Sequence, residues 1–271
     1  MKNPHVADVH IPAHLFGLAA LLNPSSWDWW TLVWFLAFNF WFSCLGMSVG
    51  FHRYFTHRAF KTTTFWRRVM LIGGSLAGQG SVVFWVALHR LHHPNSDQPP
   101  DIHTPRKGFW HAYMGWIFTL DPNAVSLSRA ADVIRDPWCR WTHRNYSMMM
   151  WLWWTAIITI AVGVEFMRPV AFGALIAGMW AIHQEALINS VCHDPRFGEA
   201  PYANVARDDS RNVWWLHWIT WGQSIHHTHH VWPHAANFML DHPRHSDLGH
   251  RVIKLIEITP DHTAEIKSFR G

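Results

Sequence analysis

Long apolar runs alternate with polar, histidine-rich stretches along this chain. Residues 30–50 contain no charged residue, and about 20 such residues are enough for an α-helix to cross a bilayer core. Residues 147–167 form a second run with Glu165 near its end, and a third run follows Pro169. A shorter run near the N-terminus is either a tilted first membrane helix or an interfacial one. The pattern predicts an all-α integral membrane protein with four transmembrane helices, at about 9–23, 30–50, 147–167 and 170–190.

The polar remainder predicts a helical cap on one side of the membrane, made of residues 51–146 and 191–271. All lysines and arginines except Lys2 and Arg168 lie in these two stretches. Loops rich in Lys and Arg stay on the cytoplasmic side of a membrane. We therefore expect one membrane domain, residues 1–271, in the bacterial inner membrane, with its cap and active site on the cytoplasmic face.

Composition agrees with a membrane protein. The chain has 20 tryptophans and only 15% charged residues, against about 25% in soluble proteins. Its net charge of +4 is not arranged as the basic stripe of a nucleic-acid-binding protein, so no nucleic-acid partner is expected. The three cysteines, Cys44, Cys139 and Cys192, are too far apart in sequence to indicate a disulfide framework or an iron–sulfur site. Electrons used by this protein must therefore come from outside.

Histidines gather in three clusters, two of which share the pattern H-x-x-H-H. Imidazoles three or four residues apart lie on one face of a helix, and several neutral imidazoles on one face are typical of a metal site. Three such faces can enclose more than one metal. The clusters contain no carboxylate ligand, unlike the Glu-x-x-His sites of soluble di-iron bundles. The clustered residues are His52, His57, His89, His92, His93, His226, His229 and His230.

A further histidine follows the last predicted membrane helix. His193 lies one helical turn after Asn189, so the pair predicts a ninth metal ligand and an asparagine that acts through a water. A capping asparagine with a surface histidine is the alternative. His183, His217 and His227 lie near the clusters in sequence but outside their pattern, and we expect them not to bind metal.

Residues 66–88 are apolar enough to resemble another membrane span, but they contain several glycines. The clusters on either side of this run can share a metal site only if both lie on one side of the membrane. A single crossing between them would separate them. We therefore predict that residues 66–88 lie at the interface or pack on the cap.

These motifs resemble integral-membrane acyl desaturases of the stearoyl-CoA desaturase type, in particular the bacterial and mycobacterial branch. The matching stretches extend over roughly residues 45–257 and include GFHRYFTHRAFKT, ALHRLHHPNSDQPPDIH, INSVCH and QSIHHTHHVWP. The resemblance implies a site with two iron ions, O₂ as co-substrate and a cap over four membrane helices. It implies that His52, His57, His89, His92, His93, His193, His226, His229 and His230 are the ligands, with Asn189 acting through water.

The resemblance also implies an acyl tunnel beneath the irons, with Gln79 and Trp85 at its bend. Glu185 stands where the family usually has a threonine at that bend. A buried carboxylate is costly without a partner and marks a functional site when it lies within a membrane segment. We expect Glu185 to contact substrate, unless it faces solvent or pairs with an arginine. Leu88 and Gln223 replace the Asp and Glu that usually precede the second and third clusters.

The sequence thus predicts an O₂-dependent desaturase that introduces a double bond into a fatty acyl chain. Its partners would be the membrane, a lipid or acyl substrate, and an external electron donor such as a ferredoxin, a rubredoxin or a cytochrome b5-like protein with a reductase. Arg53, Arg58 and Arg90 could face a carrier phosphate or the donor, or else support the site or face lipid. Two alternatives remain: a hydroxylase, acetylenase or desaturase of a less usual lipid on the same site, and a metal-binding or metal-transporting membrane protein.

Overall fold

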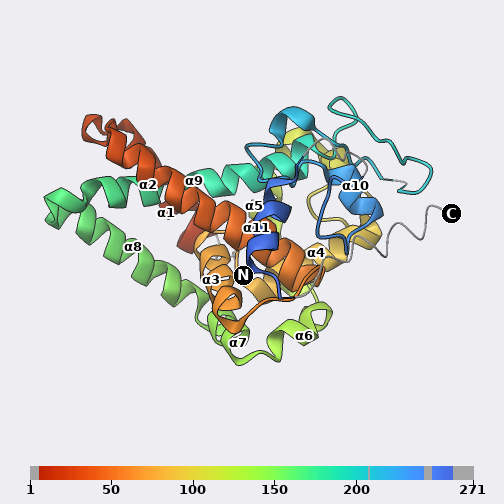
Figure 1. The fold of residues 1–271 in the computed structure, drawn as a ribbon, viewed down its shortest axis with the longest axis horizontal. Helices are drawn as coiled ribbons and strands as arrows, with labels where there is room; N and C mark the ends of the chain where they lie inside the picture. The colour runs from red at the N-terminus through yellow and green to blue at the C-terminus, as the bar shows by residue number, and fades with distance from the viewer. Residues whose placement is uncertain (1–5, 207, 241–245, 259–271) are drawn as a thin grey trace.

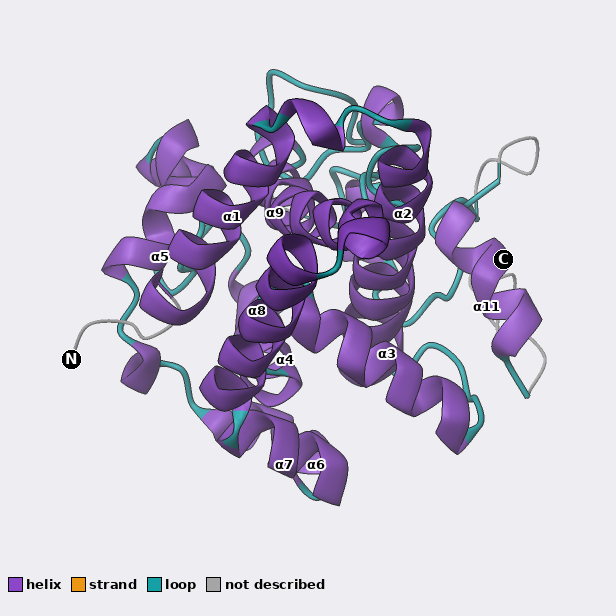
Figure 2. Ribbon diagram, turned by 90° about the vertical axis from the view of Figure 1, so that its left-hand side faces the viewer, coloured by secondary structure: helices purple, strands orange, loops and turns teal. Residues whose placement is uncertain are grey.

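The computed structural model describes residues 6–206, 208–240 and 246–258. In these residues all the regular elements are helices, and β-type pairing is limited to isolated bridges such as Thr62 with Glu257. Figure 2 shows these helices joined by loops. The prediction of an all-α fold is confirmed. The α-helices are α1 (Ile11–Leu22), α2 (Trp29–Asn39), α3 (Thr64–Leu76), α4 (Val82–Asn95), α5 (Trp116–Thr119), α6 (Ala131–Ile134), α7 (Pro137–Arg144), α8 (Tyr146–Gly163), α9 (Arg168–Val191), α10 (His226–Val231) and α11 (Leu248–Ile256).

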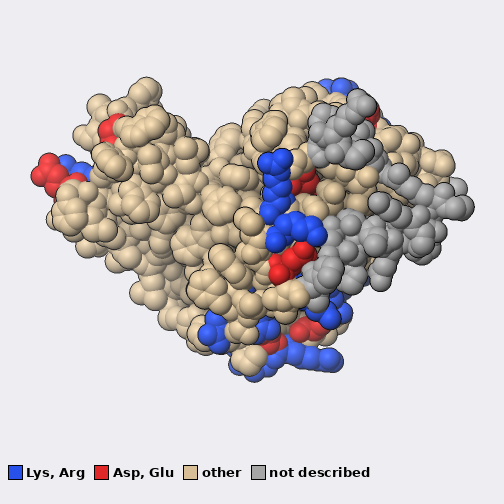
Figure 3. Space-filling view, in the orientation of Figure 1, with Lys and Arg blue, Asp and Glu red and all other residues tan. Residues whose placement is uncertain are grey.

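Three helical stretches in the described residues are long and apolar enough to cross a membrane: Trp29–Thr56, Tyr146–Gly163 and Glu165–Val191. The apolar helix Asp8–Leu22 is shorter, so a fourth span remains a prediction. In Figure 1 these helices extend to one side, away from the loops around α10. In Figure 3 the surface of that side is almost free of charged side chains except at its tip, while Lys and Arg gather across the middle and along the lower edge of the view. This division suits a protein half embedded in lipid.

The helix that begins with α2 changes its winding halfway. From Phe40 to Thr56 it is a π-helix, η3, whose hydrogen bonds link residues five apart; one example is His57 N donating to His52 O at 3.2 Å. π-Helical segments are rare and often mark functional sites. This helix extends six residues beyond the predicted end at residue 50; it includes His52, and His57 is the residue that directly follows it.

Residues 66–88 fall in two helices, α3 and α4, of 13 and 14 residues. The break between them needs two glycines, Gly78 and Gly80, with φ of 77° and 91°, values that residues with a Cβ rarely adopt. Neither helix reaches the roughly 17 residues that a membrane span requires. α3 instead packs backbone to backbone on η3, where a Cβ on Gly46 would lie 2.3 Å from Gly74 N. The glycines of this run thus have two roles: Gly74 allows close packing of α3 on η3, and Gly78 and Gly80 form the turn between α3 and α4.

Candidate metal centre

The clustered histidines and His193 form two adjacent groups. The five-histidine group contains His52, His57, His89, His93 and His229, and the four-histidine group contains His92, His193, His226 and His230. Within each group the candidate ligand nitrogens all lie within 4.8 Å of one another. Seven of these side chains come from three helical segments, η3, α4 and α10. His57 directly follows η3, and His193 lies two residues after the end of α9. The structure therefore brings together all nine histidines selected from the sequence.

Helical periodicity explains how two short motifs serve both groups. On α4, His89 and His93 are four residues apart and face the five-histidine group, whereas His92 points to the other group. On α10 the assignment is reversed: His226 and His230 face the four-histidine group and His229 the other. Residues four apart lie on one side of an α-helix, and an adjacent residue lies about 100° away. Each H-x-x-H-H motif therefore contributes side chains to both histidine groups.

The contacts between imidazoles suit a cation in each group. His52 Nε2 lies 2.8 Å from His229 Nε2, and His226 Nε2 lies 2.9 Å from His193 Nε2. Ring nitrogens without a proton repel each other at such distances unless a cation lies between them. Metal–imidazole bonds of about 2.0–2.1 Å place neighbouring ligand nitrogens about 3 Å apart. Among the residues that the structure describes, none forms a hydrogen bond with the buried Nε2 of His92.

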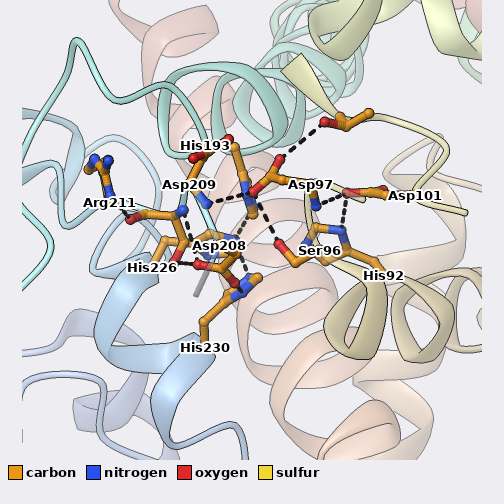
Figure 4. Close-up of polar contacts among 12 residues, drawn as sticks. His92, Ser96, Asp97, Asp101, His193, Asp208, Asp209, Arg211, His226 and His230 are labelled. Carbon is orange, nitrogen blue, oxygen red and sulfur yellow. Dashed lines mark hydrogen bonds and ion pairs between the residues drawn. The ribbon is translucent and has the colours of Figure 1, made fainter. Parts of the chain in front are cut away.

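Carboxylates orient three imidazoles of the four-histidine group, as Figure 4 shows. The Nδ1–H groups donate to side-chain oxygens: His92 to Asp101 at 3.0 Å, His193 to Asp97 at 2.9 Å and His230 to Asp208 at 2.5 Å. This bond places the proton on Nδ1 and directs the Nε2 lone pair at the group's centre. Metal-bound histidines are commonly held in this way.

Electrostatics keep most of these imidazoles neutral. Burial, and secondly the other histidines, hold the pKa values of His89, His93, His226 and His229 well below the ordinary value. His193 differs: burial lowers its pKa, but the hydrogen bond to Asp97 and the negative charges of the nearby aspartates together raise the pKa above its ordinary value. Neutral imidazole is the form that binds a metal, so most of these ligands need lose no proton on binding.

A chain of two hydrogen bonds leads from the five-histidine group to Glu185. His52 Nδ1 donates to Gln223 Oε1 at 3.0 Å, and Gln223 Nε2 donates to Glu185 Oε1 at 2.7 Å. Glu185 is 7% exposed. In the described part of the chain it bonds Gln223 and forms no ion pair with an arginine. The alternatives of solvent exposure or an arginine partner are therefore wrong for Glu185.

An enclosed cavity of about 40 Å³ lies against both groups. It is lined by ligand candidates and also by Gln79, Trp85, Glu185 and Asn189. Trp85 stacks on the ring of His89, with 4.7 Å between ring centroids. The residues that the sequence assigned to the tunnel bend therefore lie beside the histidines. Asn189 lines the same cavity as His226, which suits the expected contact through a water.

The arginines beside the clusters have structural partners. Arg53 is fully buried against Asp247. Arg90 donates to the Phe55 and Thr56 carbonyls and to Asp132. Neither guanidinium is available to a carrier phosphate, so that part of the expectation is wrong for these two residues. Arg58 pairs with Asp132 from an exposed position.

The three histidines expected not to bind metal lie in neither group. His183 contacts the Tyr113 hydroxyl, His217 the Ser246 carbonyl, and His227 the Ser210 hydroxyl and the Tyr202 amide.

The sequence did not point to the residues that form hydrogen bonds with the candidate ligands. Asp97, Asp101 and Asp208 were not selected, nor was His103, which lies 3.5 Å from Asp101. Burial alone would raise the pKa of Asp101, but His103 and His92 lower it below its usual range. A usable signal was present in the sequence, since Asp97 and Asp101 follow the second cluster in a chain that contains few charged residues.

Comparison with known proteins supports one family. The model of a family described as fatty acid desaturase matches residues 25–254. The chain is 31% identical over 235 residues to the sn-1 stearoyl-lipid 9-desaturase of Anabaena variabilis, covering 84% of this chain and 81% of that protein. It is 34% identical over 224 residues to the hex-5-enoyl-[acyl-carrier protein] acetylenase of Moorena producens, covering 72% and 64%. An acyl-CoA C20 Delta5-desaturase of Anemone leveillei is 29% identical over 242 residues, covering 88% and 74%.

Proposed function

We propose, since this chain belongs to the fatty acid desaturase family, that it uses two iron ions and O₂ to introduce a double bond into a fatty acyl chain. Membership in this family makes it a membrane fatty acyl desaturase and sets the transporter alternative aside. The observation that supports the iron site is the pair of buried imidazole groups around one cavity. We assign the nine histidines as ligands and Asn189 as a residue that acts through water.

Iron suits these ligands. Imidazole nitrogen binds ferrous iron as well as zinc or copper, but an oxidation that consumes O₂ requires a metal that changes its oxidation state. When bound, iron would supply the O₂-dependent oxidation of an unactivated C–H bond, which no side chain of this site can perform by acid–base chemistry. Overall, two vicinal hydrogens leave the acyl chain, and two electrons, two protons and O₂ complete the formation of two water molecules.

The protein's own contribution is to position and to enclose. The carboxylate-held imidazoles fix the ligand lone pairs before metal arrives. Trp85, stacked on His89, gives the cavity an apolar wall. Such packing excludes water and holds one carbon of the chain beside the metals, which contributes to rate through orientation. Gln79 and Glu185 complete the wall as the substrate-contacting residues that we propose.

We infer that the site faces the cytoplasm of a bacterial cell from its inner membrane. The distribution of Lys and Arg supports this orientation. Electrons would come from an external donor, a ferredoxin, a rubredoxin or a cytochrome b5-like protein with a reductase. The three cysteines, all in the described residues, are buried and form no disulfide.

The acyl carrier is a separate question. The names of the relatives include a lipid, an acyl carrier protein and a coenzyme A thioester, so all three belong in the test. An acetylenase or hydroxylase is a second candidate, and two observations favour it: the similarity to the Moorena enzyme, and a carboxyl group, Glu185, beside the cavity.

The test is a paired measurement of products. Lipids and acyl thioesters of a host are profiled with the wild-type chain and with His229→Ala. The purified protein is then supplied with ferrous iron, O₂, a reduced donor and each of the three carriers. We expect an alkene product that requires the wild-type chain and iron. Product formation by the His229→Ala protein, or by protein that contains no iron, would contradict the proposal.

A further inference from the structure

The two histidine groups differ in the side chains that accept hydrogen bonds from the Nδ1 groups of their imidazoles. In the four-histidine group, carboxylates of Asp97, Asp101 and Asp208 accept from three of the four rings, as Figure 4 shows. In the five-histidine group, the structure shows no carboxylate in contact with a ring, within the residues it describes. There the side-chain partner of a ring Nδ1 is the neutral amide of Gln223, which contacts His52.

Other charges near the five-histidine group do not remove this difference. Arg53, next to His52, is neutralised by Asp247 at 2.8 Å. Glu185 is separated from His52 by the Gln223 amide, so its carboxyl group is one hydrogen bond further from the rings than each of the three aspartates. Asp97 and Asp101 are 1% exposed, where solvent screens little. A dication therefore meets three nearby negative charges in one group and only neutral rings in the other.

From this difference we propose that the two metal positions are unequal, with the four-histidine group holding its iron more tightly than the five-histidine group. The proposal rests on the iron site proposed above. Residues that hold a metal-bound histidine typically contribute about 10–100-fold in metal affinity each. Three of them outweigh the one extra imidazole of the other group. A divalent ion surrounded only by neutral groups in a buried site also remains uncompensated, which is costly.

Gln223 is the residue that keeps the five-histidine position neutral. A glutamate there would place a carboxylate directly against His52. It would also lie against Glu185, so the informative variant exchanges the two residues. In Glu185→Gln/Gln223→Glu the number of charges and of hydrogen-bonding groups stays the same, and the carboxylate moves one step toward the metal.

The experiment removes iron from the purified, iron-loaded protein with a graded series of EDTA concentrations under anaerobic conditions. Iron per chain is measured at each concentration. We expect the iron content of the wild type to fall in two steps as the EDTA concentration rises. The early step, at low EDTA, is the loss of iron from the five-histidine group. Asp208→Asn should move the late step to roughly 10–100-fold lower EDTA and leave the early step in place. The exchange variant should move the early step roughly tenfold or more toward higher EDTA.

Asp209→Asn is the matched control, because its side chain binds Arg106 rather than a histidine; both steps should stay in place. Loss of both irons in one step from the wild type would overturn the proposal, as would a shift of the early step in Asp208→Asn. If Asp208→Asn does not fold, the exchange variant decides alone: an unmoved early step contradicts the proposal. Failure of the iron site itself would appear differently, as protein with no bound iron before EDTA is added.

Discussion

The guanidinium of Arg53 donates to Asp247 Oδ2 at 2.8 Å, and neither side chain has any exposed surface. Arg53 also donates to Ser48 Oγ at 2.6 Å and lies 3.8 Å from the centre of the Phe238 ring. Asp247 accepts from His250 N at the start of α11. One ion pair thus fastens the C-terminal helix to the π-helix at the residue next to His52.

Replacing Asp247 with Ala should destabilise the protein strongly. Breaking a buried ion pair leaves an uncompensated charge and costs about 3–5 kcal/mol. The measurement is the thermal unfolding midpoint in detergent. Glu165→Gln is the control, because it removes a largely exposed ion pair with Arg168, worth about 0–1 kcal/mol. Equal midpoints for both variants would show that Asp247 does not hold this contact.

Single histidine replacements test the ligand assignment. His92→Ala and His229→Ala each remove a ligand candidate from a different group, so each should lower bound iron and abolish desaturation. His227→Ala is the control on the same helix as His229, since its ring contacts Tyr202 and Ser210 instead. Iron per chain is counted by elemental analysis. Two irons retained in His229→Ala would refute the assignment of that residue.

Labelling from either side of the membrane tests the topology around α3 and α4. Lys61 and Gln98 are exposed and flank these two helices. Because neither helix is long enough to cross, single cysteines at both positions should react with an impermeant thiol reagent from the same side. A cysteine at Glu165, on the turn between α8 and α9, should react from the opposite side. If cysteines at positions 61 and 98 were labelled from opposite sides, the first and second histidine clusters would lie on opposite sides of the membrane, and the five-histidine group that contains both could not form.

An ion-pair cluster beside α4 should make stability depend on pH. Burial alone would raise the pKa of Asp132, but hydrogen bonds from Arg90 and Arg58 hold it well below its usual range. A carboxyl group with a lowered folded pKa stabilises the protein above its unfolded pKa of about 3.9, and this contribution is lost as the pH falls through the folded value. The thermal unfolding midpoint of the wild type should therefore fall more than that of Asp132→Asn as the pH is lowered from 6 to below the unfolded pKa of about 3.9. Parallel pH profiles of the two proteins would contradict this.

The sequence selected nine histidines that the structure brings together in two groups, because histidine spacing of three and four has a direct geometric meaning on an α-helix. It did not explain His52 and His57. Residues five apart lie on different faces of an α-helix, yet both rings join one group. The π-helical winding of η3 brings them together, since its hydrogen bonds link residues five apart. Such winding has no marker in hydrophobic periodicity.

Other features depended on contacts between distant segments. Asp208 is 22 residues from His230 and Asp97 is 96 residues from His193, so neither pairing follows from local patterns. Helix ends were also displaced: α8 ends at Gly163, before the predicted residue 167, because a short 3-10 turn begins at Glu165. Apolar residues beyond the last turn made the run appear longer than the helix.

Glu185 offers the sharpest test of substrate choice. It is spaced by four from Asn189 on α9, lines the cavity beside the histidines, and bonds Gln223 at 2.7 Å. Glu185→Thr removes the carboxyl group and that contact. Glu185→Gln keeps a side chain of the same length, whose amide oxygen accepts from Gln223. The pair therefore separates the effect of charge from the effect of shape.

We expect both variants to retain their iron, because Glu185 hydrogen-bonds Gln223 rather than a histidine, and at least Glu185→Thr to alter the products. If the carboxyl group recognises a polar substrate atom, Glu185→Gln should change the preferred substrate or carbon as much as Glu185→Thr does. If length alone closes the cavity, only Glu185→Thr should accept longer chains. Both are measured as product profiles across acyl chain lengths, with iron content determined on the same samples. Unchanged products and rates in both variants would make Glu185 a structural partner of Gln223, and the case for an unusual substrate would lose its main support.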